Sequence, residues 1–404
     1  MSTSLDRSSN TRNSGAMPSC EAAVECLAVD CGSLPVAAEV ARFRGTTGVM
    51  ECHVTVRLAG GCAQPLNVLE KAYQLALDAA GIDAASMVFR RLFCSDVVNQ
   101  AEMLGDFADS GTSIIGQAPL PAAKFALWAW HICDPGGGNG KTLDGSTASC
   151  HRGELTHHWT TGLTDTSEET SHGQTRRVIE DYDAWLREHG LNTADHVVRT
   201  WWFVQNIDAD YHGLVKARCD FFDNNGLTAD SHYIASTGIA GAHRDVAAKV
   251  SLDSYAISGL RQEQVEYLCA PDHLCPTHDY GVTFERATAV SYADRRHVFI
   301  SGTASIDHTG KILHECDIIR QLDRTLENIE ALLAKAGANL GDLASILVYL
   351  RDPADGAAVE TALRERMGTV SYVMVQAPVC RPGWLIEIEG IAVVQANLPQ
   401  LPAF

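Results

Sequence analysis

One sequence pattern occurs three times along the 404-residue chain. Each copy has an apolar helical segment, a turn that contains glycine, an apolar strand-like run and a second strand near its end. The helical segments lie at residues 68–76, 178–186 and 320–333. The strand-like runs lie at residues 87–93, 197–204 and 343–350. The repetition predicts three α+β modules, each with a sheet face that must be covered by helices or by another module.

The repeat also predicts where the modules begin and end. Residues 117–119 and 376–378 both read Gln-Ala-Pro before a strand of matching length, and a glycine-rich stretch from Asp134 separates the first two copies. We expect modules at 23–145, 146–260 and 261–404. Residues 1–22 are rich in Ser and Asn and poor in apolar residues, which is typical of a disordered tail.

Composition excludes several classes of function. There are 31 Lys and Arg against 50 Asp and Glu, a net charge of −19 without any basic patch, so we expect no binding to nucleic acid or to an anionic membrane. The chain lacks an apolar run of membrane-spanning length and an apolar signal peptide, which predicts a cytoplasmic protein. Cys269, His273, Cys275 and His278 do not follow a zinc-ligand spacing, so we expect no metal site.

The third copy resembles the RidA (YjgF) superfamily. The resemblance lies in HVFISGTASI at residues 297–306, in the helix and turn at 325–343, and in IEIEGIAV at 386–393. Members of that superfamily are usually trimers of one small, ferredoxin-type, chorismate-mutase-like α+β module. Three copies in one chain imply a pseudo-trimer, so the expected assembly is a monomer or a dimer.

Within this superfamily the chain looks most like the chorismatases, single chains of RidA-like modules that split pyruvate from chorismate. The similar stretches are 197–218, 284–290, 299–306 and 380–390, whereas the first 150 residues give no independent family signal and form a degenerate module. The resemblance implies an enzyme without a cofactor that acts on a small anionic substrate. The expected products are pyruvate and a cyclohexadienoate or hydroxybenzoate, with the third module catalytic.

The resemblance assigns catalytic roles to Glu387 and Cys380. Glu387 and Glu389 alternate with isoleucines, so in a strand both carboxyl groups lie on one face. Burial in a closed cleft raises the pKa of a carboxyl group, which would let Glu387 protonate the vinyl carbon of an enol ether. Glu389 is expected to be structural. Cys380 stands where hydroxybenzoate-forming members have a cysteine, and we interpret it as a wall residue that shapes the product.

Substrate binding is expected to need arginine, because a dianion that enters an acidic protein requires a local cation and the guanidinium group matches a carboxylate. Arg381 and Arg286 are the candidates, and Phe284 begins the same similar stretch as Arg286. Ser301, Gly302 and Thr303 follow an apolar strand, where glycine lets a ligand approach the backbone. A turn at residues 236–238 is a further candidate for lining the cleft.

Departures from the family pattern leave alternatives open. Ala217 replaces a tyrosine between two basic residues, and Glu360 replaces an asparagine of the second helix. Residues 371–373 contain no arginine, although RidA deaminases bind the substrate carboxylate with one there. This argues against the second hypothesis, an enamine or imine deaminase. A third hypothesis is a member of the fold that binds a small ligand without catalysis.

Overall fold

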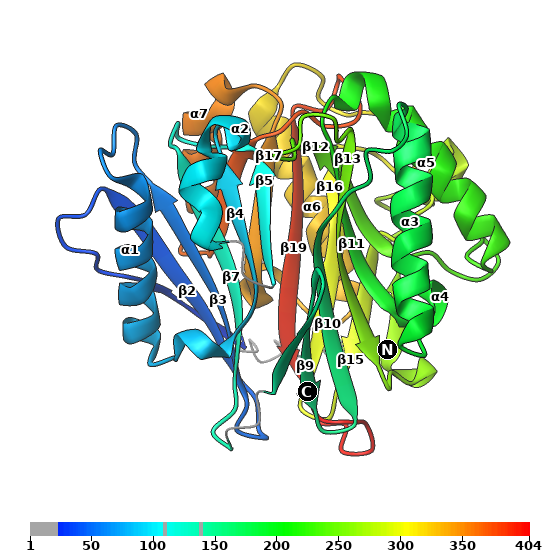
Figure 1. Ribbon diagram of the computed structural model, residues 1–404, viewed down its shortest axis with the longest axis horizontal. Helices are drawn as coiled ribbons and strands as arrows, with labels where there is room; N and C mark the ends of the chain where they lie inside the picture. Colours follow the sequence, from blue (N-terminus) through cyan, green and yellow to red (C-terminus); the bar gives the residue numbers. More distant parts are fainter. Residues whose placement is uncertain (1–22, 108–110, 137–139) are drawn as a thin grey trace, which may run out of the picture.

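The computed structural model describes residues 23–107, 111–136 and 140–404, so the expected tail at 1–22 lies outside the described residues. Three mixed sheets run side by side through the middle of the molecule, and helices such as α1, α3 and α5 cover the outside (Figure 1). The described part of the chain has no helix that is both long and apolar enough to cross a membrane.

The first sheet has the order β1-β2-β3-β7-β4-β5. Its strands are β1 (Val24–Ala28), β2 (Val36–Arg44), β3 (Met50–Leu58), β4 (Met87–Cys94), β5 (Thr112–Gly116) and β7 (Phe125–Cys133). Its helices are α1 (Pro65–Ala80) and the short α2 (Val97–Gln100), with 3₁₀ turns η1 (Ala84–Ser86) and η2 (Ala101–Phe107).

The second sheet has the order β12-β11-β13-β10-β9-β8. Its strands are β8 (Lys141–Asp144), β9 (Thr147–Arg152), β10 (Leu155–Leu163), β11 (Val197–Val204), β12 (Ala235–Ala240) and β13 (Val250–Ser258), and its helices are α3 (Ser171–Glu188), α4 (Thr193–His196) and α5 (Ile207–Asn224). Strand β8 belongs to this sheet although it precedes residue 146, where we expected the second module to begin.

The third sheet has the order β14-β15-β16-β19-β17-β18-β6. Its strands are β14 (Val265–Leu268), β15 (Ala287–Ser291), β16 (Arg295–Ala304), β17 (Leu343–Leu350), β18 (Tyr372–Gln376), β19 (Ile386–Gln395) and, from the first module, β6 (Ala118–Pro119). Its helices are α6 (Ile318–Lys335) and α7 (Gly356–Met367), with 3₁₀ turns η3 (Gln262–Gln264), η4 (Thr277–Tyr280), η5 (Leu340–Asp342) and η6 (Pro353–Asp355).

The repeated elements form where the sequence predicts them. Strands β11 and β17 span the predicted runs, and β4 extends the first run by one residue. Helix α6 buries Leu322, Leu326, Ile329 and Leu333, which recur every three or four residues, and the Asp317 carboxylate caps its first turn.

The three sheets pack around a common centre. Strands β3, β11 and β17 are buried along their whole length, so each is covered on one face by its own helices and on the other by neighbouring modules. The contacts between modules are cyclic, because β5 touches β10, β12 touches β16 and β18 touches β3. This confirms the predicted pseudo-trimer of three tandem α+β modules.

Buried ion pairs cross all three boundaries between modules. Arg91 of the first module lies 2.7 Å from Asp253 of the second, and Arg199 of the second lies 2.7 Å from Glu389 of the third. Glu51 closes the ring, since His297 of the third module lies 2.8 Å from its Oε2 and Arg295 lies 3.3 Å away. These charges are removed from water, so each depends on its partner in the next module.

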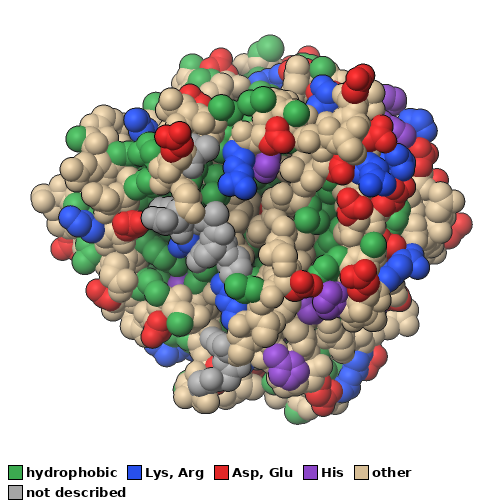
Figure 2. Space-filling view, viewed as in Figure 1, with side chains coloured by type: hydrophobic (Ala, Val, Ile, Leu, Met, Phe, Trp, Pro, Cys, Tyr) green, Lys and Arg blue, Asp and Glu red, His purple; other side chains and the backbone are tan. Residues whose placement is uncertain are grey.

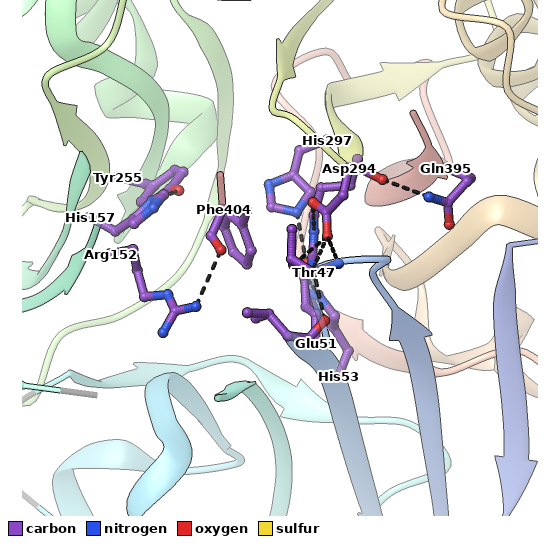
Figure 3. A network of polar contacts seen from close by, with 12 residues as sticks. Thr47, Glu51, His53, Arg152, His157, Tyr255, Asp294, His297, Gln395 and Phe404 are labelled. Atoms are coloured by element: carbon purple, nitrogen blue, oxygen red, sulfur yellow. Dashed lines mark hydrogen bonds and ion pairs between the residues drawn. The ribbon is translucent and has the colours of Figure 1, made fainter. Parts of the chain in front are cut away.

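The network around Glu51 is shown in Figure 3, where His297 and His53 point toward the carboxylate and the Phe404 ring lies between His157 and His297. Burial alone would raise the pKa of Glu51, but His297 and His53 outweigh it and hold the pKa well below its usual range. Glu51 is therefore an anion at the centre of the molecule.

We expect Asp253→Ala to reduce the free energy of unfolding by about 3–5 kcal/mol, because it leaves the fully buried Arg91 guanidinium without its carboxylate. Glu25→Ala, which removes the exposed pair with Arg42, is the matched control and should cost less than about 1 kcal/mol. Urea unfolding followed by circular dichroism measures both. Equal losses in the two variants would contradict a role for the Arg91–Asp253 pair in holding the modules together.

Candidate active site

A cavity of about 50 Å³ lies at the boundary between the second and third modules. The second module contributes Tyr211, Arg218, Ser236, Thr237 and Gly238, and the third contributes Val282, Phe284, Arg286, Gly302, Ala304, Ile306, Cys380, Arg381, Trp384 and Glu387. A second cavity of about 240 Å³ adjoins it and shares Phe284 and Arg286 as part of its wall. The first cavity alone is smaller than an ordinary ligand site, and Phe284 and Arg286 belong to the walls of both cavities.

Hydrogen bonds between β12 and β16 build this boundary. The Ser236 N–H donates to the Ser301 hydroxyl at 2.9 Å, and the Gly302 N–H donates to Thr237 Oγ1 at 2.9 Å. Residues 236–238 thus line the cavity as part of a strand and not as the turn that we expected. The register of β16 against β19 shifts between Ile300 and Thr303, a bulge of the kind that often redirects residues beside a site.

Glu387 extends from β19 into the cavity and is 5% exposed. A Cβ atom at Gly302 would lie 2.2 Å from its Oε1 atom, so any larger residue there would force the Glu387 carboxyl group to move. Burial, together with the negative charge of Glu389, raises the pKa of Glu387 to about 8, against a smaller opposing effect of Arg199 and Arg286. Glu387 is therefore protonated at neutral pH.

Glu389 lies two residues further along β19 and has a different environment. Its carboxylate accepts hydrogen bonds from Arg199 Nη2 at 2.7 Å and from Trp201 Nε1 at 2.8 Å, both from β11 of the second module. The pair of acidic residues is thus divided: Glu389 is a paired structural anion, and its charge helps to keep the nearby Glu387 carboxyl group neutral.

The other two module boundaries lack this carboxyl group. Strands β7, β13 and β19 are equivalent in the three modules, and they pair with β4, β11 and β17, respectively. The residues opposite the seventh residue of these partner strands are Ala126, Ser251 and Glu387. Arg57 lies opposite Ala126, donates to both Glu39 oxygens and stacks on the Tyr372 ring at 3.8 Å. An ion pair thus occupies the boundary between the third and first modules.

The two departures from the family pattern lie outside the cavity lining. Glu360 accepts a hydrogen bond from the Tyr372 hydroxyl at 2.8 Å and belongs to the boundary that Arg57 occupies. Ala217 is buried on α5 beside Arg218. On the same helix, Tyr211 contributes a phenol to the cavity, so the site has a tyrosine although residue 217 is alanine.

Three arginines from separate segments line the cavity. Arg286 donates from Nε and Nη2 to the Cys275 carbonyl oxygen, and the Arg381 guanidinium lies 4.9 Å from the centroid of the Trp384 ring. Arg218, which our sequence analysis did not assign to the site, donates to the hydroxyls of Thr283 and Ser236. Its signal was the pair of basic residues on either side of Ala217, where the family pattern has arginines.

Cys380 lies next to Tyr211 at the cavity wall. Burial, and then the neighbouring Glu387, raise the pKa of the Cys380 thiol to about 12, so the thiol is protonated and a weak nucleophile. Burial also raises the pKa of the Tyr211 phenol well above its usual value. Both side chains are therefore neutral groups that shape the cavity.

Most residues that the sequence predicts for the site line the cavity: Phe284, Arg286, Gly302, Cys380, Arg381 and Glu387. Ser301 and Thr303 do not, because they flank Gly302 and use their hydroxyls within the structure. Ser301 donates to the Glu285 carbonyl oxygen, and Thr303 donates to the Ser301 carbonyl oxygen. The described residues contain no group of three or more His, Cys, Asp or Glu side chains placed to hold a metal ion.

The third module matches a known family over most of its core. The family model described as endoribonuclease L-PSP matches residues 286–394. A RutC family protein of Pyrococcus abyssi is 39% identical over 98 residues, which cover 24% of this chain and 76% of that protein.

Two further relatives extend the similarity beyond this module. A 3-hydroxybenzoate synthase of Streptomyces hygroscopicus is 28% identical over 234 residues, which cover 51% of this chain and 65% of that protein, so the match spans less than two thirds of its length. A crystal structure of a chorismatase superposes with a TM-score of 0.59 and 18% identity, covers 76% of this chain and 93% of that chain, and confirms the α+β fold with three mixed sheets. The chain belongs to the RidA (YjgF, L-PSP) superfamily.

Proposed function

We propose that this protein is a cofactor-independent enzyme that cleaves the enolpyruvyl ether of chorismate, or of a related carboxylated substrate. The products would be pyruvate and a cyclohexadienoate or hydroxybenzoate. The main support is the juxtaposition in one cavity of a buried carboxyl group that is protonated at neutral pH, Glu387, with three arginines. The similarity to a 3-hydroxybenzoate synthase over 234 residues points to the same chemistry.

In this proposal Glu387 acts as the general acid. Its proton goes to the terminal vinyl carbon of the enol ether, the π electrons of the double bond form the new C–H bond, and an oxocarbenium ion results. Water then attacks this ion and gives up a proton to the Glu387 carboxylate, and the resulting hemiketal collapses to pyruvate and the ring alcohol. In the alternative, a ring hydroxyl attacks in place of water and returns its proton to the same carboxylate. The Glu387 carboxylate left behind is stabilised by the positive charges of Arg199 and Arg286.

The arginines would bind the substrate carboxylates, and Cys380 with Tyr211 would form the wall against the ring. Arg218 from the second module and Arg286 and Arg381 from the third all line the cavity, which suits a molecule with more than one anionic group. A thiol that is protonated cannot add readily to the oxocarbenium ion, so Cys380 is assigned to product shape and not to covalent catalysis.

A deaminase and a non-catalytic binding protein remain the competing hypotheses. In the deaminase hypothesis an arginine near residue 372 would bind the substrate, but Tyr372 lies at the boundary occupied by Arg57 and Glu360. Incubation with chorismate should yield pyruvate, and incubation with an enamine should yield no ammonia beyond the spontaneous rate. Ammonia release catalysed from the enamine would favour the deaminase, and binding of chorismate without pyruvate release would favour the non-catalytic protein.

We expect Glu387→Gln to reduce kcat by at least about 10²-fold while the protein stays folded, because the amide keeps the shape but has no acidic proton. Glu365→Gln, the same change at an exposed position of α7, should leave kcat unchanged. Pyruvate release measures both variants. Activity near that of the wild type in Glu387→Gln would exclude Glu387 as the general acid.

The pH profile gives a second test. Glu387 must be protonated to act and its pKa lies at about 8, so kcat/KM should be constant with respect to this group below pH 8 and fall about tenfold per pH unit above it. Initial rates of pyruvate release between pH 6 and about 10 measure the profile. A rate that rises through this range would indicate a general base instead.

The arginines give a third test. Arg381→Lys and Arg286→Lys should each lower kcat/KM by about 10- to 100-fold, because an ammonium group does not reproduce the two-point contact of guanidinium with a carboxylate. Arg366→Lys at the protein surface, where the side chain faces Asp323, is the control and should have no effect. If both cavity variants keep full kcat/KM, the carboxylates bind elsewhere.

A further inference from the structure

The indole N–H of Trp384 has no hydrogen-bond partner among the described residues, although the side chain is only 5% exposed. Trp384 lines the same cavity as Glu387 and Arg381. A buried donor without an acceptor destabilises a protein, and a ligand bound in the cavity that this side chain lines can supply the missing acceptor. No step of the proposed mechanism uses this group.

Several hydrogen bonds hold the Trp384 backbone in place. Its N–H donates to the Arg381 carbonyl oxygen at 3.0 Å. On either side, the Gln321 side chain donates to the Gly383 carbonyl oxygen and accepts from the Leu385 N–H, both at 2.9 Å. The loop is thus anchored to helix α6 by one glutamine. Trp384 is therefore a preorganised part of the cavity wall.

The neighbouring charge indicates which acceptor fits. The Arg381 guanidinium lies over the Trp384 ring, with Cζ 4.9 Å from the ring centroid, so the space beside this indole has a positive potential. An indole N–H is a donor only, and its partner must be an acceptor. An anionic oxygen satisfies both groups, whereas a cationic amine is repelled by Arg381.

On the basis of the proposed function, we propose that Trp384 is a specificity-determining residue that donates its Nε1–H to a substrate carboxylate oxygen, beside the charge of Arg381. In this proposal the loop at residues 380–385 binds the substrate carboxylate. Because the contact is made in the ground state and in the transition state, its loss should act on KM more than on kcat.

The test compares two tryptophans that are alike except for their location. Trp159 on β10 is also buried and its Nε1–H also has no partner among the described residues, but it does not line this cavity. Trp384→Phe should raise KM for chorismate about tenfold and change kcat less than about twofold, and Trp159→Phe should leave KM within about twofold. Replacement of Trp384 by 3-benzothienylalanine, which keeps the ring shape but has no N–H, should reproduce the rise in KM.

The result that would overturn the proposal is a KM within about twofold of wild type when Trp384 is replaced by benzothienylalanine. The same conclusion follows if Trp159→Phe raises KM as much as Trp384→Phe, since the effect would then come from packing. Benzothienylalanine removes the N–H donor but keeps the volume of the ring, so it measures the effect of the donor alone.

A binding experiment separates failure of this inference from failure of the proposed function. If the wild-type protein releases no pyruvate from chorismate, the proposed reaction is wrong, and calorimetry with 3-hydroxybenzoate and with phenol then tests Trp384 alone. Trp384→Phe should weaken binding of 3-hydroxybenzoate about tenfold and leave binding of phenol, which lacks the carboxylate, unchanged. Equal Kd values for 3-hydroxybenzoate in the two proteins, or failure of the wild type to bind it, would reject the inference.

Discussion

The ring of buried ion pairs is the constraint on which the rest of the structure depends. Arg91 with Asp253, Arg199 with Glu389, and Arg295 with Glu51 each join one module to the next. Charges removed from water on both sides are strongly destabilising when one partner is absent, so the modules are specified as a set of three. A helix-covered sheet could bury its apolar face in several ways, but these pairs are satisfied together in the cyclic arrangement.

The same interactions set the chemistry of the candidate site. Arg199 and Trp201 donate hydrogen bonds to the Glu389 carboxylate, and the charge of Glu389 adds to burial in raising the pKa of Glu387. The Arg199–Glu389 ion pair, which joins two modules, therefore also affects the pKa of the general acid in the proposed reaction. The division of two neighbouring glutamates into a paired anion and a neutral acid needs residues from β11, which lies in a different module.

Among the described residues, a carboxyl group stands at the position of Glu387 in only one of the three modules, although the modules share a topology. At the register of Glu387 the other modules have Ala126 and Ser251, and Arg57 with Glu39 occupies the space next to Ala126. A trimer of identical modules would have equivalent residues at every boundary. Three copies in one chain remove that requirement, so two boundaries can serve stability while the third keeps a cavity.

Local sequence pattern was sufficient for the elements of the fold and for part of the site. The helical and strand periods predicted α6, β11 and β17, and the alternation around Ile388 placed Glu387 and Glu389 on one face, because these periods depend only on neighbours along the chain. The sequence did not distinguish Gly302, which faces the cavity, from Ser301 and Thr303 beside it, since the β16 bulge that sets their directions depends on pairing with β19.

Only the tertiary structure brought Arg218 and Tyr211 to the same cavity as Glu387. Helix α5 and strand β19 belong to different modules and are far apart in the sequence, so no local pattern relates their side chains. The pKa of Glu387 was likewise decided by packing, because the burial that raises it most is complete only where the second and third modules close on each other. Sequence thus determined which groups are available, and the packing of the modules determined which of them meet and in which protonation state.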